Sequence, residues 1–363
     1  MNSRERVLAA LKCQQPDRVP IFEAGIDEPV ILELARILGL ETHGQQAPET
    51  QLYAEESRET SDLYCLIVQE LGLDATCMSF SIGLRRLDGD YARDKYGSLY
   101  RLSPHGQPLV VDGPISEISD LRSCDMASRL SCDDFAGVRY VVDRVGNEKA
   151  HFVAVTDPFK TSWLLRGGME KLLLDYSLDP ALVHGLMRIA TDYALAAVDM
   201  AVDLGADVIF TDGDLAGELT TLMSPRHYRM YVKPYQKEIA DHTHLRGLPI
   251  VKHTDGNIWP ILDDFLDIGY DGFHPVQPQC MDIAEVKRRV AGRLCLLGNI
   301  DCRNLLVFGT EQEVVDSVKE TMARVAPGGG YILSSSNSIH ADCRALNYIA
   351  MVRAAHEQGL YRE

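Results

Sequence analysis

The sequence HTDGN at 253–257 combines a histidine and a carboxylate two residues apart, directly after the apolar run PIVK. Side chains alternate along an extended strand, so His253 and Asp255 are expected on one side and Thr254 on the other. A histidine and a carboxylate placed in this way could ligate one divalent metal or act as an acid/base pair. A structural alternative is open, in which His253 bonds to a neighbouring strand and Asp255 caps the next helix.

A second pair, Asp212 and Asp214, ends the apolar run in FTDGD and also shares one face of a strand. Two carboxylates this close repel each other, so one of them has a raised pKa unless a cation or a hydrogen-bond donor lies between them. Metal binding, general base catalysis and capping of the following helix all stay open for this pair.

Other apolar runs end in polar residues as well. They are Glu23 after VPIF, Asp157 after HFVAVT, His274 and Gln277 in GFHPVQP, Asn299 and Asp301 in GNID, and Asn337 after YILSSS. Asn299 could donate to a substrate, and Asp301, on the same face, could support it. Pro275 and Pro278 offer a different interpretation of GFHPVQP, as a shaped exit from a strand.

The elements that must position these residues alternate regularly along the second half of the chain. Apolar runs cover 151–158, 207–214, 249–257, 272–278, 293–301 and 330–337, and helical periodicity covers 179–204, 224–245, 258–268, 282–291, 310–325 and 344–358. This alternation is typical of a parallel sheet that is buried on both faces. The carboxyl ends of its strands share one rim, where active sites gather, so the pattern predicts an enzyme.

The whole chain, 1–363, is expected to be one α/β domain built as a (β/α)₈ barrel, because no linker rich in Gly, Pro or Ser divides it. The segment VPIFEAG (19–25) is expected to be the first strand. Helices are expected near the amino terminus at 4–12, 28–40 and 55–73. The short, Gly-punctuated stretch 76–112 alternates polar and apolar residues, which predicts a β-hairpin excursion before the barrel resumes.

The net charge and the cysteines limit the binding partners and the cellular compartment to be expected for the protein. The net charge of −17 disfavours nucleic acids and anionic membranes, both of which attract Lys/Arg patches. The nine cysteines form no CxxC pair, and no secretory segment is recognisable at the start, so reduced thiols in a cytoplasmic protein are expected. No apolar segment is expected to reach the roughly 20 residues that a membrane span requires.

An ordered set of motifs resembles the uroporphyrinogen decarboxylase superfamily over nearly the whole chain. The set is DRVP, SPxxYxxYVKPYxKxI, HTDG, GFHPVQP, GNID and PGGGYILSSSNSI. The resemblance implies a single distorted (β/α)₈ TIM barrel with its active site at the carboxyl ends of the strands. It also implies one of two activities: cofactor-free decarboxylation of uroporphyrinogen, or zinc-dependent methyl transfer to or from a corrinoid protein.

Two departures argue against the decarboxylase branch. Its members carry an Arg-Gln-Ala-Gly-Arg segment that holds the carboxylates of the substrate, and this chain has Glu23-Ala24-Gly25-Ile26-Asp27 there. Acids in place of the arginines would repel a polycarboxylate. The late Gly-His-Gly-Ile segment of that branch is also replaced, by Ser336-Asn337-Ser338-Ile339.

The methyltransferase branch is closer, although its zinc ligands are altered. In that branch a His-x-Cys and a later Cys hold zinc, and these positions correspond here to His253, Asp255 and Asn337. A site of His253, Asp255 and Glu23 would be richer in oxygen, which suits zinc that polarises an ether or alcohol oxygen better than zinc that activates a thiol.

The sequence thus favours a corrinoid-dependent methyltransferase that moves a methyl group between a small methoxy or N-methyl substrate and a cobalamin carried by a separate corrinoid protein. One alternative is a cofactor-free decarboxylase of a small acid or porphyrinogen-like substrate, and another is a non-catalytic ligand-binding barrel. A homodimer is compatible with either enzyme. The roles assigned are catalytic for Asp212, Asp255, Asn299 and Asp301, substrate binding for Glu23, Asp157, His274, Gln277 and Asn337, and zinc binding for His253, Asp255 and Glu23.

Overall fold

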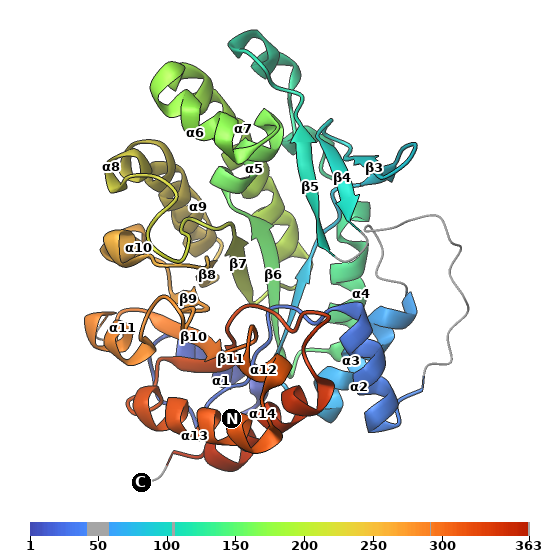
Figure 1. Ribbon diagram of the computed structural model, residues 1–363, viewed down its shortest axis with the longest axis vertical. Helices are drawn as coiled ribbons and strands as arrows, with labels where there is room; N and C mark the ends of the chain where they lie inside the picture. Colours follow the sequence, from blue (N-terminus) through green and yellow to red (C-terminus); the bar gives the residue numbers. More distant parts are fainter. Residues whose placement is uncertain (42–57, 104–105, 291, 362–363) are drawn as a thin grey trace.

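The protein is described by a computed structural model that covers residues 1–41, 58–103, 106–290 and 292–361. Seven parallel strands form one curled sheet in the order β1-β6-β7-β8-β9-β10-β11, surrounded by helices (Figure 1). The strands are β1 (Ala75–Ser79), β6 (Ala150–Thr156), β7 (Val208–Asp212), β8 (Ile250–His253), β9 (Gly272–His274), β10 (Cys295–Ile300) and β11 (Tyr331–Ser335). The α/β fold and the single distorted TIM barrel expected from the sequence are confirmed.

The segment 19–22 closes the sheet between β11 and β1. Phe22 N donates to Leu333 O and Leu333 N donates to Pro20 O, both at 2.9 Å, while Asp74 N donates to Ile21 O at 2.8 Å. These contacts are isolated bridges, so the expected strand 19–25 is wrong as a regular element. The physical reason is that Pro20 has no N–H to contribute to a ladder.

The barrel interior is packed with apolar side chains rather than open. Phe22, Phe152 and Phe210 meet there, and the ring centroids of Phe22 and Phe152 lie 4.4 Å apart. Helix α1 (Ser3–Leu11) adds Val7 and Leu11 to the same cluster. The interior therefore gives the residues at the carboxyl ends of the strands a rigid apolar floor.

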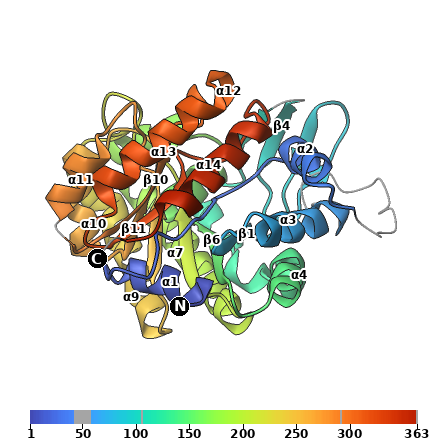
Figure 2. The ribbon, with the colours of Figure 1, turned by 90° about the horizontal axis from the view of Figure 1, so that it is seen from below.

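The remaining helices cover the outside of the sheet, and α13 and α14 pack side by side (Figure 2). They are α2 (Glu28–Leu38), α3 (Arg58–Glu70), α4 (Ala136–Val145), α5 (Pro158–Arg166), α6 (Met169–Leu178), α7 (Pro180–Asp203), α8 (Pro225–His227), α9 (Lys233–Leu245), α10 (Leu262–Ile268), α11 (Ile283–Val290), α12 (Leu305–Phe308), α13 (Glu311–Val325) and α14 (Ala345–Gln358). The six helices expected after residue 178 are all present. The helix expected over 55–73 begins outside the described residues.

The short helix α12 was not predicted, and neither were α5 and α6. Helices α5 and α6 lie between β6 and α7, where Gly167 and Gly168 adopt positive φ angles of 78° and 142°. These glycines interrupt the periodicity that would otherwise reveal a helical stretch. Because α5 follows β6 directly, this unpredicted helix lies at the carboxyl ends of the strands.

The excursion is a four-stranded antiparallel sheet of β2 (Arg85–Arg86), β3 (Tyr91–Arg93), β4 (Leu99–Ser103) and β5 (Gly106–Asp112). Figure 1 shows it at the same end of the molecule as α5 and α6. The expected excursion over 76–112 began too early, because Ala75 and Cys77 face the barrel interior and belong to β1.

One described helix, α7, has the length and apolar composition of a membrane span, which corrects the expectation that no segment approaches it. Its most apolar window is 56% buried inside the molecule. Leu186, Ala190 and Ala197 lie on its buried face, and it packs against α5 and α9. The helix is thus accounted for as a core helix of the barrel.

Candidate active site

The parallel register aligns polar residues of four neighbouring strands at one level. Thr156 on β6 pairs with Asp212 on β7, Asp212 pairs with His253 on β8, and His253 pairs with His274 on β9. Side chains at equal register on adjacent strands are immediate neighbours. The strand ends therefore bring two histidines and a carboxylate together, as the alternation in the sequence predicted.

The loops that follow β7 and β8 are joined by direct hydrogen bonds. Asp255 N donates to Asp214 Oδ1 at 3.0 Å, and Leu215 N donates to Thr254 Oγ1 at 2.8 Å. Gly256 permits this approach, because its φ is +85° and a Cβ there would lie 2.6 Å from Gly217 O. The two loops form one unit that holds their carboxylates in fixed places.

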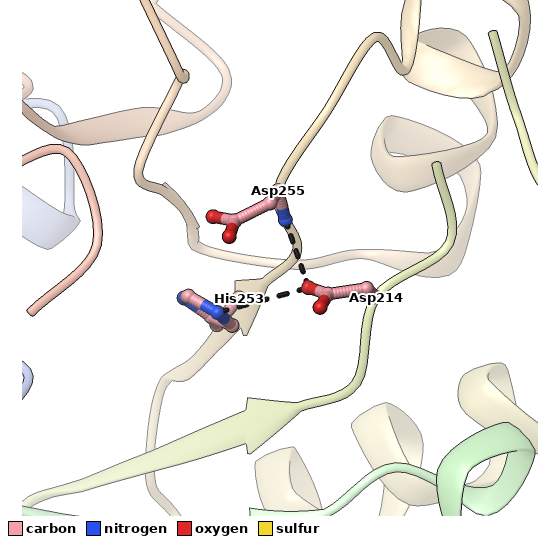
Figure 3. Close-up of side chains that lie close together, drawn as sticks. All are labelled: Asp214, His253 and Asp255. Atoms are coloured by element: carbon pink, nitrogen blue, oxygen red, sulfur yellow. Dashed lines mark hydrogen bonds and ion pairs between the residues drawn. The ribbon is translucent and has the colours of Figure 1, made fainter. Parts of the chain in front are cut away.

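Asp214, His253 and Asp255 form a group of three side chains that could hold a metal ion. One ligand atom from each lies within 4.8 Å of the others. Figure 3 shows the His253 ring and the Asp255 backbone nitrogen both directed at the Asp214 carboxylate. The distance from His253 Nε2 to Asp214 Oδ1 is 3.8 Å. A single cation could therefore contact all three residues.

The pattern of hydrogen bonds indicates which nitrogen of each histidine carries the proton. Ser334 Oγ donates its only proton to Ser335 O at 2.9 Å, so it accepts from His274 Nε2–H at 3.1 Å. His274 Nδ1 then carries a lone pair and accepts from His253 Nδ1–H, 2.8 Å away. In the neutral His253 ring the lone pair is therefore on Nε2, the nitrogen that faces Asp214.

The surroundings keep His274 neutral. It is fully buried, and burial, followed by the nearby charge of His253, holds its pKa well below the ordinary value. Phe210 lies beneath both histidines, with ring centroids 5.7 Å from His253 and 5.4 Å from His274. A neutral, orienting second histidine is the arrangement that sets a metal-ligating histidine in one tautomer.

Asp255 has one satisfied and one unsatisfied oxygen. Its Oδ2 accepts from Asn337 Nδ2, whereas its Oδ1 is buried and has no hydrogen-bond partner among the described residues. Burial raises the pKa of Asp255; the charge of His253 opposes this shift, and that of Asp214 adds to it. A bound divalent cation would satisfy Oδ1 and favour the ionised form. The donor set of one imidazole nitrogen and two carboxylates fits zinc or a harder divalent ion.

Asp157, predicted to bind substrate, is instead held within a structural network. Its Oδ2 accepts from Lys252 Nζ at 2.8 Å and from Gln236 Nε2 at 2.7 Å, and its Oδ1 accepts from Phe159 N at the start of α5. Lys252 Nζ also donates to Gly213 O at 2.9 Å. The side chains of Asp157 and Lys252 are both 0% exposed. The structure does not bring Asp157 to the His253 group.

Asp212, predicted to be catalytic, forms an ion pair with Lys160 of α5 at 2.5 Å. Burial raises the pKa of Asp212, but the charge and hydrogen bond of Lys160 outweigh it, so the net shift is downward. The carboxylate is therefore ionised at neutral pH and is poorly suited to be a proton donor. It lies beside His253 but outside the group of three ligands.

Glu23, predicted to bind metal and substrate, lies on another side of β11. Ser335 Oγ donates to its Oε1 at 2.7 Å, whereas the adjacent Ser334 faces His274. Glu23 is 1% exposed, and burial raises its pKa to about 8. Burial therefore favours the protonated form of this carboxyl, and Glu23 is not part of the metal-ligating group.

The other predicted residues either support the loop that carries Asp255 or make local contacts in their own loops. Gln277 Oε1 accepts from Gly256 N at 2.9 Å, so Gln277 supports the loop that carries Asp255. Asn299 Nδ2 donates to Val276 O at 2.9 Å. Asp301 Oδ1 accepts from the backbone of the turn that follows it, at Arg303 N and Asn304 N. Asn299 and Asp301 therefore make local contacts that shape their loops.

The model of the family described as Uroporphyrinogen decarboxylase (URO-D) matches residues 2–358. The chain belongs to the URO-D family. Two curated relatives are named uroporphyrinogen decarboxylase. The one from Methylococcus capsulatus is 23% identical over 61% of this chain and 63% of its own length, and the one from Hydrogenovibrio crunogenus is 22% identical over 69% of this chain and 72% of its own length.

A solved structure, described as a methyltransferase from Methanosarcina mazei, has the same fold as this URO-D chain. It superposes with a TM-score of 0.74 at 22% identity and covers 98% of this chain and 99% of that one. The likeness shows that the two chains share their fold over nearly their whole lengths.

Two residues of this candidate site, Asp214 and Lys160, were missing from the roles assigned from the sequence. Asp214 shares the i, i+2 spacing with Asp212, and the spacing alone does not say which carboxylate faces His253. Lys160 lies on α5, which was not predicted, so its ion pair with Asp212 had no signal in the sequence.

Proposed function

We propose that this chain is a methyltransferase that moves a methyl group between a small methoxy or N-methyl compound and a cobalamin carried by a separate corrinoid protein. The observation that carries the proposal is the group of Asp214, His253 and Asp255, which presents an imidazole lone pair and a buried carboxylate oxygen without a partner. A decarboxylase that works without a cofactor has no need for such a group.

Asp214, His253 and Asp255 would hold the metal. Zinc bound there would act as a Lewis acid that polarises the heteroatom bearing the methyl group. Around it, Asn337 holds one Asp255 oxygen and His274 keeps the Nε2 lone pair of His253 directed at the site. In the transfer, a new bond to the methyl carbon would form from an electron pair of the reduced corrinoid as the bond between that carbon and the substrate heteroatom breaks. The electron pair of the broken bond would stay on the heteroatom, which would take up a proton from the solvent.

The ionised Asp212–Lys160 pair beside the metal ligands contributes electrostatically. Lys160 is positively charged, since the carboxylate of Asp212 raises its pKa. Its ammonium group lies next to the rim of β7 and compensates part of the negative charge that two aspartates place there. The apolar floor of Phe210 and Phe152 beneath the histidines excludes water from below.

The test is methyl transfer to free, chemically reduced cobalamin from a panel of methoxylated and N-methylated compounds, followed by the absorbance change on methylation. Wild-type protein loaded with zinc should turn over at least one compound. The variant His253→Ala should lose most of this activity, whereas Asp301→Asn, which changes a carboxylate in a nearby turn, should keep it.

The opposite result is equally informative. If the His253→Ala protein transfers methyl groups as well as the wild type does, the proposal is wrong. Release of CO₂ from small acids or a porphyrinogen in the absence of cobalamin would instead favour a decarboxylase, as the names of the curated relatives indicate for those proteins.

A further inference from the structure

The outer face of the excursion sheet carries an unusual concentration of arginines. Alternation along β2, β3 and β4 puts Arg85, Arg93 and Arg101 on the exposed face, while Ala92 and Tyr100 between them are buried against the body of the protein. Arg85 lies directly opposite Arg93, and Arg101 lies opposite Tyr91. Arg86 is exposed beside them.

These charges are not neutralised by the protein itself. Within the described part of the chain, Arg85, Arg86 and Arg101 make no ion pair, and Arg93 donates only to Gly97 O. Like charges directly opposite each other destabilise a sheet, so Arg85 and Arg93 do not serve its folding. In a chain with 53 acidic and 36 basic residues, such a face points to an external anionic partner.

The same face is also partly apolar. Arg85, Arg86 and Arg93 line an open groove of about 760 Å³ with Tyr91 and Leu99, and Asp88 is also in its lining. On the neighbouring strand Leu109 is 64% exposed and Val111 is 37% exposed. Exposed arginine and tyrosine mixed with aliphatic side chains is the composition of a protein-binding surface rather than of one for a small anion.

We propose that this surface, made by Arg85, Arg86, Arg93, Arg101, Tyr91 and Leu109, docks the acidic, partly apolar face of a separate protein. Given the proposed function, on which this assignment rests, that protein is the carrier of the methyl acceptor. The excursion stands at the same end of the molecule as α5 and α6, which follow the carboxyl end of β6, so a partner docked on it would lie on the side of the barrel at which the strands end (Figure 1). A two-fold pairing of this face with a second copy would place arginines against arginines and is disfavoured.

The experiment compares two methyl acceptors in the double variant Arg85→Glu/Arg93→Glu. One acceptor is free reduced cobalamin, and the other is a purified corrinoid carrier protein from the source organism. With the carrier, kcat/KM should fall at least about ten-fold and the salt dependence of the wild-type rate should disappear, since reversed rim charges act on association. With free cobalamin, the rate should be unchanged. Arg353→Glu, on α14, is the matched control, because Arg353 is exposed and makes no ion pair within the described residues.

Each other outcome overturns the docking assignment or the function separately. Equal rates of the double variant and the wild type with the carrier would show that the face does not dock it. A parallel loss with free cobalamin would show that the arginines serve the site or the fold rather than docking, and would overturn the assignment. A wild-type dimer that dissociates only in the double variant would assign the face to a second copy. Wild-type protein that methylates neither acceptor would disprove the proposed function, and direct binding of the carrier to wild type and variant would still decide the docking.

Discussion

Lys252 and His253 are neighbours on β8, yet their side chains belong to two opposite kinds of polar group. Lys252 joins Asp157 and Gln236 in a network in which every charged atom has a partner. His253 joins Asp214 and Asp255 in a group that leaves one buried carboxylate oxygen without a partner. Buried polar groups are nearly always paired, so the first network is explained by folding, and we propose that a ligand completes the second.

The difference shows how adjacent residues can be assigned to stability and to function. A complete network would gain nothing from a bound ion, and breaking it should destabilise the fold. An incomplete group should contribute little to the fold, and breaking it should abolish ligand binding. Substitutions in the two groups should therefore have opposite effects. Those in the Lys252 network should lower stability, and those in the His253 group should lower the affinity for a ligand.

The largest effect is expected from Lys252→Met. It leaves the Asp157 carboxylate buried without its cation, which should lower the free energy of unfolding by about 3–5 kcal/mol in urea denaturation. The double variant Lys252→Met/Asp157→Asn should recover part of the loss, because no charge is then buried alone. Unchanged stability of the single variant would contradict the assignment of this pair to folding.

The second substitution, Asp255→Asn, should have the reverse profile. It removes a charged ligand, so the affinity for zinc should fall at least about 100-fold, more than is typical when only an outer-shell partner of a metal site is lost. The stability of the metal-free protein should stay within about 1 kcal/mol of the wild type, because Asp255 Oδ1 has no partner to lose. Competition with a chromogenic chelator measures the affinity, and Asp301→Asn is the control.

The alternation of strand residues accounts for how much of this site the sequence could predict. It placed His253 and Asp255 on one side, and the motif comparison assigned Asn337 to the same site, where it donates a hydrogen bond to Asp255. Alternation could not separate Asp212 from Asp214. That choice depends on Lys160, which reaches Asp212 from a helix that two glycines had hidden.

Glu23 shows a different limit of the sequence. Being the ionisable residue at a strand tip made it a candidate ligand, but its direction depends on how 19–22 bridges β11 rather than on its own residue type. Ser334 contacts His274, whereas the next residue, Ser335, contacts Glu23. Which of these side chains faces which partner depends on the packing of the whole barrel.

Glu23 also permits a test by pH. Burial raises its pKa from the ordinary 4.5 to about 8, so the folded protein holds a proton that the unfolded chain releases above pH 4.5. This contribution to stability is complete below about pH 4.5 and is lost as the pH rises to about 8. Between pH 6 and 8 the loss should reach about 2 kcal/mol. In urea denaturation Glu23→Gln should show a flatter pH profile than the wild type; parallel profiles would mean that Glu23 is ionised in the folded state.

The smallest effect is expected for His274, which shares one property with each group. Like Lys252 it is fully buried, and like Asp214 and Asp255 it contacts the candidate metal ligand His253. His274→Phe removes the acceptor for His253 Nδ1–H, so the Nε2 lone pair is no longer set toward Asp214 and zinc affinity should fall about ten-fold. His274→Asn keeps a side-chain oxygen that can accept this hydrogen bond and should retain more of the affinity at comparable stability. A purely structural role predicts that both variants lose stability while zinc affinity, measured on the folded fraction, stays the same. A larger loss of affinity in the Phe variant at equal stability would identify His274 as the residue that positions His253.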